Sequence, residues 1–156
     1  MPLKKLIEFL DKQGVKYVTI RHSRAYTAQE IAESAHLPGK ELAKAVMIKI
    51  DGKMAMAVLP ATERVDFDLL KAVVSSKNVQ LAEEAEFKNM FPECEIGAMP
   101  PFGNLYGMEV YAERSLAEDR EIAFNAGSHT ELFRLSYQDY ERLVKPRLAR
   151  FAVENY

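Results

Sequence analysis

Two apolar runs separated by a single Asp-Gly pair constrain this chain more than any other local feature. The runs cover residues 45–50 and 53–59, and Asp51-Gly52 lies between them. An Asp-Gly pair suits the two-residue turn that joins antiparallel strands, because both turn positions adopt a left-handed backbone conformation. The sequence therefore predicts a β-hairpin, and with it a sheet.

Helix and strand signals alternate along the rest of the chain. Apolar residues at helical spacing before Gly14 predict a helix over residues 3–12, and Thr27-Ala28-Gln29-Glu30 has the capping-box pattern of a helix ending at Ala35. Further helices are expected over residues 66–73, 83–90 and 136–146, and in the tail, 147–156; further strands are expected over residues 17–22, 109–112, 121–125 and 131–135. This pattern predicts an α/β protein (mixed α+β), a mixed sheet flanked by helices in one domain over residues 1–156.

Composition limits the class of protein. The chain has 156 residues, of which 48% are hydrophobic and 28% charged, as is typical of a globular domain. A formal net charge of −2 excludes a generally basic nucleic-acid coat and leaves room for a local pocket that grips one RNA end. The N-terminus lacks the apolar core of a signal peptide, and no run approaches the roughly 20 apolar residues that span a bilayer. We expect a soluble, cytoplasmic protein with neither a membrane nor DNA as a partner.

Most familiar catalytic patterns are absent. His22, His36 and His129 are far apart, and no Cys or His pair has the spacing of zinc ligands, so neither a metal nor another cofactor is expected. Cys94, the single cysteine, lies between Glu93 and Glu95, whose carboxylates disfavour a reactive thiolate. The sequence also contains no serine-nucleophile elbow, no phosphate-binding glycine loop and no recognisable carboxylate pair.

One segment suggests chemistry without a catalytic side chain. In residues 97–103, Gly-Ala-Met-Pro-Pro-Phe-Gly, two prolines flanked by glycines restrict the backbone tightly. Such a loop can direct main-chain N–H groups toward an oxyanion or a terminal nucleotide. We therefore consider it together with Lys44 and with the segment Gly127-Ser128-His129.

These motifs, in this order, resemble the YbaK/ProX family. The resemblance rests on Ala43-Lys44-Ala45-Val46, on Gly97 and Pro101 in a Gly-x-x-x-Pro loop, and on residues 124–129, Phe-Asn-Ala-Gly-Ser-His. Members are free-standing relatives of the editing insertion domain of bacterial prolyl-tRNA synthetases. The resemblance implies a curved mixed β-sheet flanked by helices. It also implies a trans-editing deacylase, which hydrolyses the ester that joins a wrong amino acid to the 3′ end of a tRNA.

The resemblance also suggests the site. The family's functional lysine corresponds to Lys44 and its loop to Gly97 and Pro101, which we expect to be catalytic. Backbone N–H groups near Gly97 and Gly127 are candidate oxyanion donors, because an aminoacyl ester is already activated and needs mainly positioning and charge stabilisation. The residues expected to bind substrate are His22, Met47, Phe102, Gly127, Ser128 and His129.

Several alternatives stay open on the sequence alone. The expected partners are the 3′ acceptor end of a mischarged tRNA and, second, an aminoacyl-tRNA synthetase. A non-catalytic module that holds a tRNA end or a synthetase would keep the same pocket, and a hydrolase of small-molecule esters is a third reading. The edited amino acid is equally open among alanine, cysteine, serine and threonine.

Overall fold

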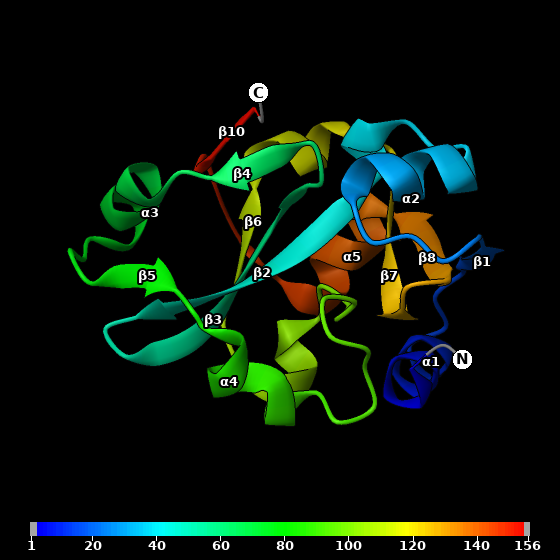
Figure 1. The fold of residues 1–156 in the computed structure, drawn as a ribbon, viewed down its shortest axis with the longest axis horizontal. Helices are drawn as coiled ribbons and strands as arrows, with labels where there is room; N and C mark the ends of the chain where they lie inside the picture. The colour runs from blue at the N-terminus through cyan, green and yellow to red at the C-terminus, as the bar shows by residue number, and fades with distance from the viewer. Residues whose placement is uncertain (1–2, 155–156) are drawn as a thin grey trace.

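The computed structural model describes residues 3–154 and is built around a twisted five-stranded sheet (Figure 1). The central hairpin pairs β2 with β3, β5 lies antiparallel outside β2, and β6 and then β9 continue the sheet in parallel beyond β3. The strands of this sheet are β2 (Ala43–Ile50), β3 (Lys53–Pro60), β5 (Val79–Leu81), β6 (Val110–Glu113) and β9 (Arg147–Ala149).

A second, three-stranded antiparallel sheet adjoins the first. Its order is β1-β8-β7, with β1 at Val18–Arg21, β7 at Glu121–Ser128 and β8 at Glu131–Ser136. Leu42, just before β2, forms a parallel bridge with Ala123 of β7, so the two sheets meet where β2 begins. A small pair, β4 (Glu63–Val65) with β10 (Ala152–Glu154), completes the strands of the described chain.

The helices begin at side-chain caps that the sequence makes recognisable. Thr27 and Glu30 form a reciprocal capping box at the start of α2, Asp66 accepts two backbone N–H groups at α3, and Ser136 accepts one at α5. The α-helices are α1 (Lys4–Lys12), α2 (Ala28–Ala35), α3 (Phe67–Val74), α4 (Glu84–Phe87) and α5 (Tyr137–Val144). Short 3-10 helices cover Gly39–Glu41, Lys88–Met90, Gly103–Tyr106 and Arg114–Glu118.

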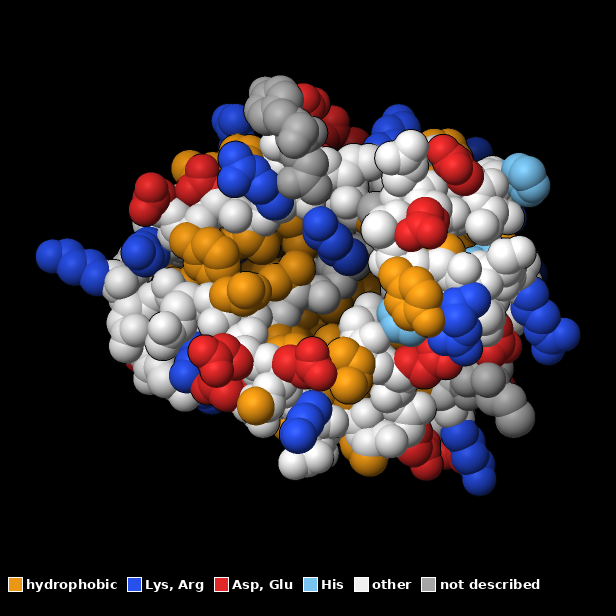
Figure 2. Space-filling view, viewed as in Figure 1, with side chains coloured by type: hydrophobic (Ala, Val, Ile, Leu, Met, Phe, Trp, Pro, Cys, Tyr) orange, Lys and Arg blue, Asp and Glu red, His pale blue; other side chains and the backbone are white. Residues whose placement is uncertain are grey.

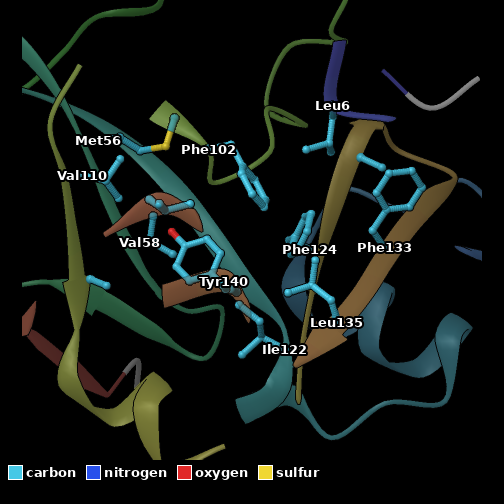
Figure 3. Packing of buried hydrophobic residues seen from close by; sticks show 14 of the residues in the cluster. Leu6, Met56, Val58, Phe102, Val110, Ile122, Phe124, Phe133, Leu135 and Tyr140 are labelled. Atoms are coloured by element: carbon cyan, nitrogen blue, oxygen red, sulfur yellow. The ribbon is translucent and has the colours of Figure 1, made fainter. Parts of the chain in front are cut away.

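The main core lies between the two larger sheets (Figure 3). Phe102 is fully buried at its centre, with its ring 5.3 Å from that of Phe124 and 5.4 Å from that of Tyr140. A second cluster covers the opposite face of the five-stranded sheet, where Ile48 and Leu59 pack against α3. Strand β2 therefore has a core on both faces, and polar side chains on it lie where these cores end.

Most of the predicted elements are confirmed. The Asp51-Gly52 turn joins β2 and β3 with φ angles of 52° and 81°, as expected for a two-residue hairpin. The mixed α+β class is also confirmed. In the expected helix over residues 83–90, a single α-helical turn passes into a 3-10 turn. No helix among residues 3–154 is long and apolar enough to cross a membrane.

The expected helix in the tail is wrong. Residues 147–149 and 152–154 form β9 and β10 instead, and the last two residues lie outside the described part of the chain. The physical reason is a long-range partner. The buried carboxylate of Glu113 accepts the N–H groups of Phe151 and Ala152 at 2.9 and 3.0 Å, which fixes this segment as extended chain.

Candidate active site

Lys44 extends from the beginning of β2, close to the junction of the two sheets. Its side chain is half-buried, and Nζ donates one long hydrogen bond, 3.4 Å, to the carbonyl of Ala61. No carboxylate within residues 3–154 forms an ion pair with it. Burial lowers the pKa of Lys44, and the more distant charge of Glu63 opposes that shift. Lys44 is thus a partly desolvated ammonium with donors to spare.

The glycine-proline loop is fastened to the end of β7 by two backbone hydrogen bonds. The N–H of Glu95 donates to the carbonyl of Gly127 at 2.8 Å, and the N–H of Gly127 donates to the carbonyl of Ala98 at 3.0 Å. Gly97, between these contacts, has a φ of +83°, which glycine adopts without strain. Within the described chain, no hydrogen bond engages the N–H groups of Ile96 and Gly97. The loop therefore presents free backbone donors at Ile96 and Gly97.

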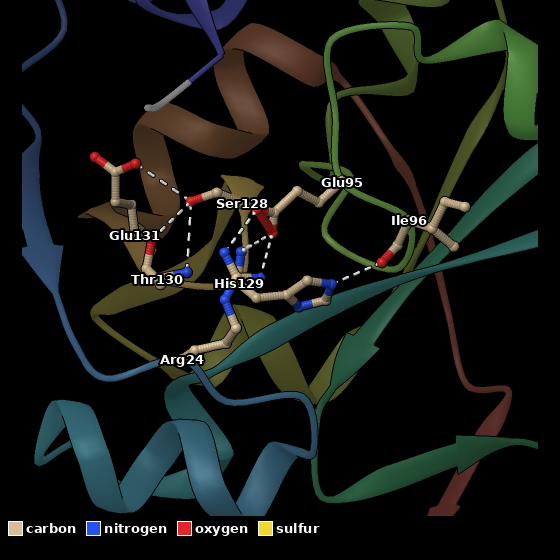
Figure 4. Close-up of polar contacts among 7 residues, drawn as sticks. All are labelled: Arg24, Glu95, Ile96, Ser128, His129, Thr130 and Glu131. Atoms are coloured by element: carbon tan, nitrogen blue, oxygen red, sulfur yellow. Dashed lines mark hydrogen bonds and ion pairs between the residues drawn. The ribbon is translucent and has the colours of Figure 1, made fainter.

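His129 follows β7 and packs against this loop (Figure 4). Its Nε2 lies 2.7 Å from the carbonyl oxygen of Ile96, and because a carbonyl only accepts, Nε2 carries the proton. A Cβ at Gly97 would lie 3.5 Å from the ring, so the glycine lies directly beside it. The other ring nitrogen, Nδ1, is buried and has no partner among residues 3–154.

A carboxylate at the base of the loop orients the same histidine. Glu95 accepts the backbone N–H of His129 at 2.9 Å and pairs with Arg24 through two hydrogen bonds of 3.1 Å. The backbone of Ala25 also contacts this region, since its N–H donates to the carbonyl of His129 at 3.3 Å. We call residues 22–27, which connect β1 to α2, the strap. The hydrogen bonds from Arg24, and to a smaller extent that from the backbone of His129, lower the pKa of Glu95.

The Lys44 side and the His129 side are joined beneath the surface by a small apolar cluster. Ala25, Leu42, Ala61 and Ala123 belong to it, together with Ile31 and Leu132. Leu42 accepts the N–H of Ala61, the residue that accepts Lys44, whereas Ala25 donates to His129. Figure 2 shows one face of the molecule, with a hollow near its middle and hydrophobic side chains on the floor of that hollow. A cavity of about 630 Å³ is lined on one side by residues of α2 and on the other by Ala61 and Thr62.

The structure brings some of the predicted site residues together and separates others. Gly97 lies directly beside His129, and the small apolar cluster that contains Ala61 connects them to the Lys44 side. Pro101 is buried below the loop, where its carbonyl accepts the hydroxyl of Tyr140 at 2.7 Å. His22 follows β1, and its Nδ1 donates to the carbonyl of Ser23 at 2.7 Å.

Four expectations need correction. Met47 and Phe102 were expected to bind substrate, yet both side chains are buried in the main core. Met47 lies there because successive side chains of a strand alternate, which places it on the face of β2 opposite Lys44. Gly127 cannot supply a free oxyanion donor, because its N–H is bonded to Ala98. The hydroxyl of Ser128 is 3.2 Å from Glu131 and points to β8.

Sequence reasoning missed Arg24 and Glu95. Arg24 and Glu95 are 71 residues apart, so no local spacing links them. The one usable signal is the position of Glu95, two residues before the first glycine of the loop. A carboxylate there can anchor the loop from outside.

Comparison with known proteins decides the family. The sequence profile of the aminoacyl-tRNA editing domain matches residues 22–143, which include the strap, Lys44, the loop and His129. The chain belongs to the aminoacyl-tRNA editing domain family. The YbaK/ProX resemblance and the deacylase class expected from the sequence are confirmed by this match and by the names of its relatives.

Relatives of this editing-domain chain include free-standing proteins. The multifunctional Ser/Thr-tRNA deacylase ProXp-y of Escherichia coli (strain K12) is 28% identical over 153 residues, which cover 95% of this chain and 91% of that protein. The prolyl-tRNA editing protein ProX of Acetoanaerobium sticklandii is 24% identical over 147 residues, covering 90% of this chain and 88% of the relative. A solved structure of a proposed trans-editing enzyme for prolyl-tRNA synthetase has a TM-score of 0.81 at 18% identity and covers 98% of this chain and 96% of its own. That likeness shows a shared fold.

Proposed function

We propose that this chain hydrolyses the ester of a mischarged tRNA, acting in trans, with Lys44, the loop over residues 95–101 and His129 forming the site. Two observations carry the assignment: the half-buried ammonium of Lys44 has no ion-pair partner among residues 3–154 and only one long hydrogen bond, and the N–H groups of Ile96 and Gly97 are free within the same residues. Such donors bind the developing oxyanion of an ester without a nucleophilic side chain. The family match supports the same reaction.

The reaction needs little acid–base chemistry from the protein. Water attacks the carbonyl carbon of the ester, the bond from that carbon to the ribose oxygen breaks, and a free amino acid and a tRNA with a free terminal hydroxyl result. The backbone donors of the loop stabilise the negative charge on the carbonyl oxygen, and the neighbouring ribose hydroxyl assists the water. Lys44 binds the terminal phosphate or the carbonyl region as a point charge.

We attribute the selectivity among aminoacyl esters to the size of the pocket that receives the amino acid. A synthetase cannot reject a small amino acid by binding alone, so a second site that admits only small esters corrects it. The name of the Escherichia coli relative, a Ser/Thr-tRNA deacylase, favours seryl and threonyl esters over alanyl and cysteinyl esters as substrates. We place the reaction in the cytoplasm, with a synthetase as a second partner.

The test is deacylation of 3′-labelled tRNAs, each charged with one amino acid, namely alanine, cysteine, serine or threonine. Wild-type protein, Lys44→Ala and the matched control Lys53→Ala, which removes an exposed lysine of the same hairpin, are compared. We expect the wild type to hydrolyse one or two of the esters and Lys44→Ala to be slower by at least tenfold. Lys53→Ala should match the wild type.

Two results would contradict the proposal. If every ester survived the wild-type protein, the non-catalytic reading would replace it, and binding of the uncharged tRNA end would become the function to measure. If esters of small molecules were cleaved as fast as aminoacyl-tRNA, the third reading, a small-molecule hydrolase, would be favoured.

A further inference from the structure

Two of the most exposed large apolar residues of the described chain contact His129, Tyr26 through its ring and Ile96 through its backbone carbonyl. Tyr26 is 63% exposed and Ile96 is 56% exposed. The Tyr26 ring centroid is 4.6 Å from that of His129 at an interplanar angle of 48°, and the carbonyl of Ile96 accepts the same imidazole. An exposed aromatic side chain that packs on a functional residue indicates a surface that a ligand covers.

Tyr26 is exposed, and it is also held in place. Its ring rests on His129 at one end, and its hydroxyl interacts with Arg24 at the other. The bonds of Arg24 to Glu95, and then its interaction with Tyr26, raise the pKa of the guanidinium. Arg24 is in turn bonded to Glu95 at the base of the loop. An aromatic ring that is ordered on one face and open to solvent on the other loses little entropy when a flat ligand stacks on it.

We propose that the open face of Tyr26 is the stacking platform for the terminal adenine of the tRNA. The ester lies on the ribose of that adenosine, so a platform beside His129 holds the base while the ester reaches the loop and Lys44. Single-stranded RNA ends are recognised in this way, by bases stacked on aromatic rings. The platform presupposes the deacylase function proposed above, and it adds the residue that positions the substrate.

Charge at the platform suits a base better than a phosphate. The Arg24 guanidinium is half-exposed, and Glu95 already neutralises it through two hydrogen bonds. Nearby backbone phosphates would therefore gain little from Arg24, whereas the face of a neutral base meets no charge penalty. The aromatic ring is consequently the dominant contact, and it should be insensitive to salt.

The absence of tryptophan from the sequence makes a direct optical test available. Tyr26→Trp introduces a single indole at the platform. Leu81→Trp introduces one at an exposed apolar position on β5, an edge strand of the five-stranded sheet. Each variant is titrated with an RNA hairpin that ends in CCA and carries no amino acid, with the same hairpin ending in CC, and with adenosine monophosphate alone.

We expect the CCA hairpin to quench the indole emission of the Tyr26→Trp variant, and the CC hairpin to quench it at least fivefold less. Neither hairpin should change the emission of the Leu81→Trp variant. In deacylation assays, Tyr26→Leu should raise KM about tenfold with kcat changed less than threefold, since stacking contributes on the order of 1–3 kcal/mol per base. Tyr26→Phe, which keeps the ring, should retain most of the affinity for the CCA hairpin.

Equal quenching of the Tyr26→Trp variant by the two hairpins, or no quenching of it at all, would overturn the platform. So would a Tyr26→Leu variant that loses kcat and keeps KM. Because the hairpins carry no amino acid, the optical result is independent of whether the wild type hydrolyses any ester. A failure of the proposed function and a failure of the platform are therefore distinguishable.

Discussion

At the scale of single residues, the site depends on side chains that the fold leaves incompletely satisfied. Lys44 has one long hydrogen bond, and Nδ1 of His129 is buried with no partner in the described chain. Groups left in this state cost stability, and proteins retain them where a ligand supplies the missing contact. The same argument explains why the expected pocket residues Met47 and Phe102 are poor candidates, since the core satisfies both completely.

Replacing Lys44 should separate function from stability. Its pKa is lower in the folded protein than the ordinary 10.5, so folding disfavours the charged form. Unfolded chains therefore bind more protons between the lowered pKa and 10.5, stability rises with pH across that window, and the full penalty applies at neutral pH. Lys44→Met should keep or raise the melting temperature at pH 7 while deacylation falls at least tenfold. A melting temperature lower by more than about 3 °C would make the role structural.

At the scale of elements, the site is assembled from pieces whose local structure the sequence predicts and whose meeting it does not. The hairpin, the capping box of α2 and the strands β7 and β8 follow from turn residues, caps and alternation within a few positions. The tail could not be predicted, because Arg147–Ala149 and Ala152–Glu154 become strands through partners in β6 and β4. Likewise, Arg24 and Glu95 meet only in the folded chain.

The clamp formed by Arg24 and Glu95 should govern the motion of the loop. Glu95→Ala removes the acceptor of the His129 N–H and the partner of Arg24, so amide hydrogen exchange at Ala98 and at His129, whose N–H groups are hydrogen-bonded to Glu95, should accelerate at least tenfold at pH 7. Glu93→Ala, a nearby exposed carboxylate, is the matched control. Unchanged exchange in Glu95→Ala would show that backbone bonds alone hold the loop.

The pH dependence of this clamp has a definite sign. Hydrogen bonds from Arg24 and His129 lower the pKa of Glu95 below its ordinary 4.5. A carboxyl group of this kind stabilises the fold at every pH above its ordinary pKa, and that contribution is lost only as pH falls through the lowered value. Loop exchange, corrected for its intrinsic pH dependence, should thus be constant from about pH 8 to about pH 5.

At the scale of the whole molecule, one buried carboxylate connects the C-terminal segment to the central sheet. Glu113 of β6 accepts the N–H groups of Phe151 and Ala152 through one oxygen and that of Ser115, at 2.8 Å, through the other. Phe151 is fully buried in the cluster on the α3 side of the sheet. β10 then pairs with β4, which follows the Ala61 turn, so the acceptor of Lys44 depends indirectly on this connection.

Glu113→Gln should destabilise the protein without altering the site's chemistry. The amide keeps one acceptor oxygen and turns a donor NH₂ toward a backbone donor, leaving at least one buried N–H unpaired, which costs about 3 kcal/mol. For a chain of this length the melting temperature should fall by about 6–12 °C. Glu118→Gln, which changes an exposed carboxylate further along the same segment, should change the melting temperature by less than about 2 °C.

Activity measured below the melting temperatures of Glu113→Gln and Glu118→Gln separates this structural role of Glu113 from a role in the site. At about 20 °C, where both variants are folded, kcat/KM for the preferred ester should stay within about threefold of the wild type. The reason is that Glu113 contacts none of the residues proposed to bind substrate, its partners being the N–H groups of Ser115, Phe151 and Ala152. A large loss of kcat/KM with an unchanged melting temperature would place Glu113 in the site itself.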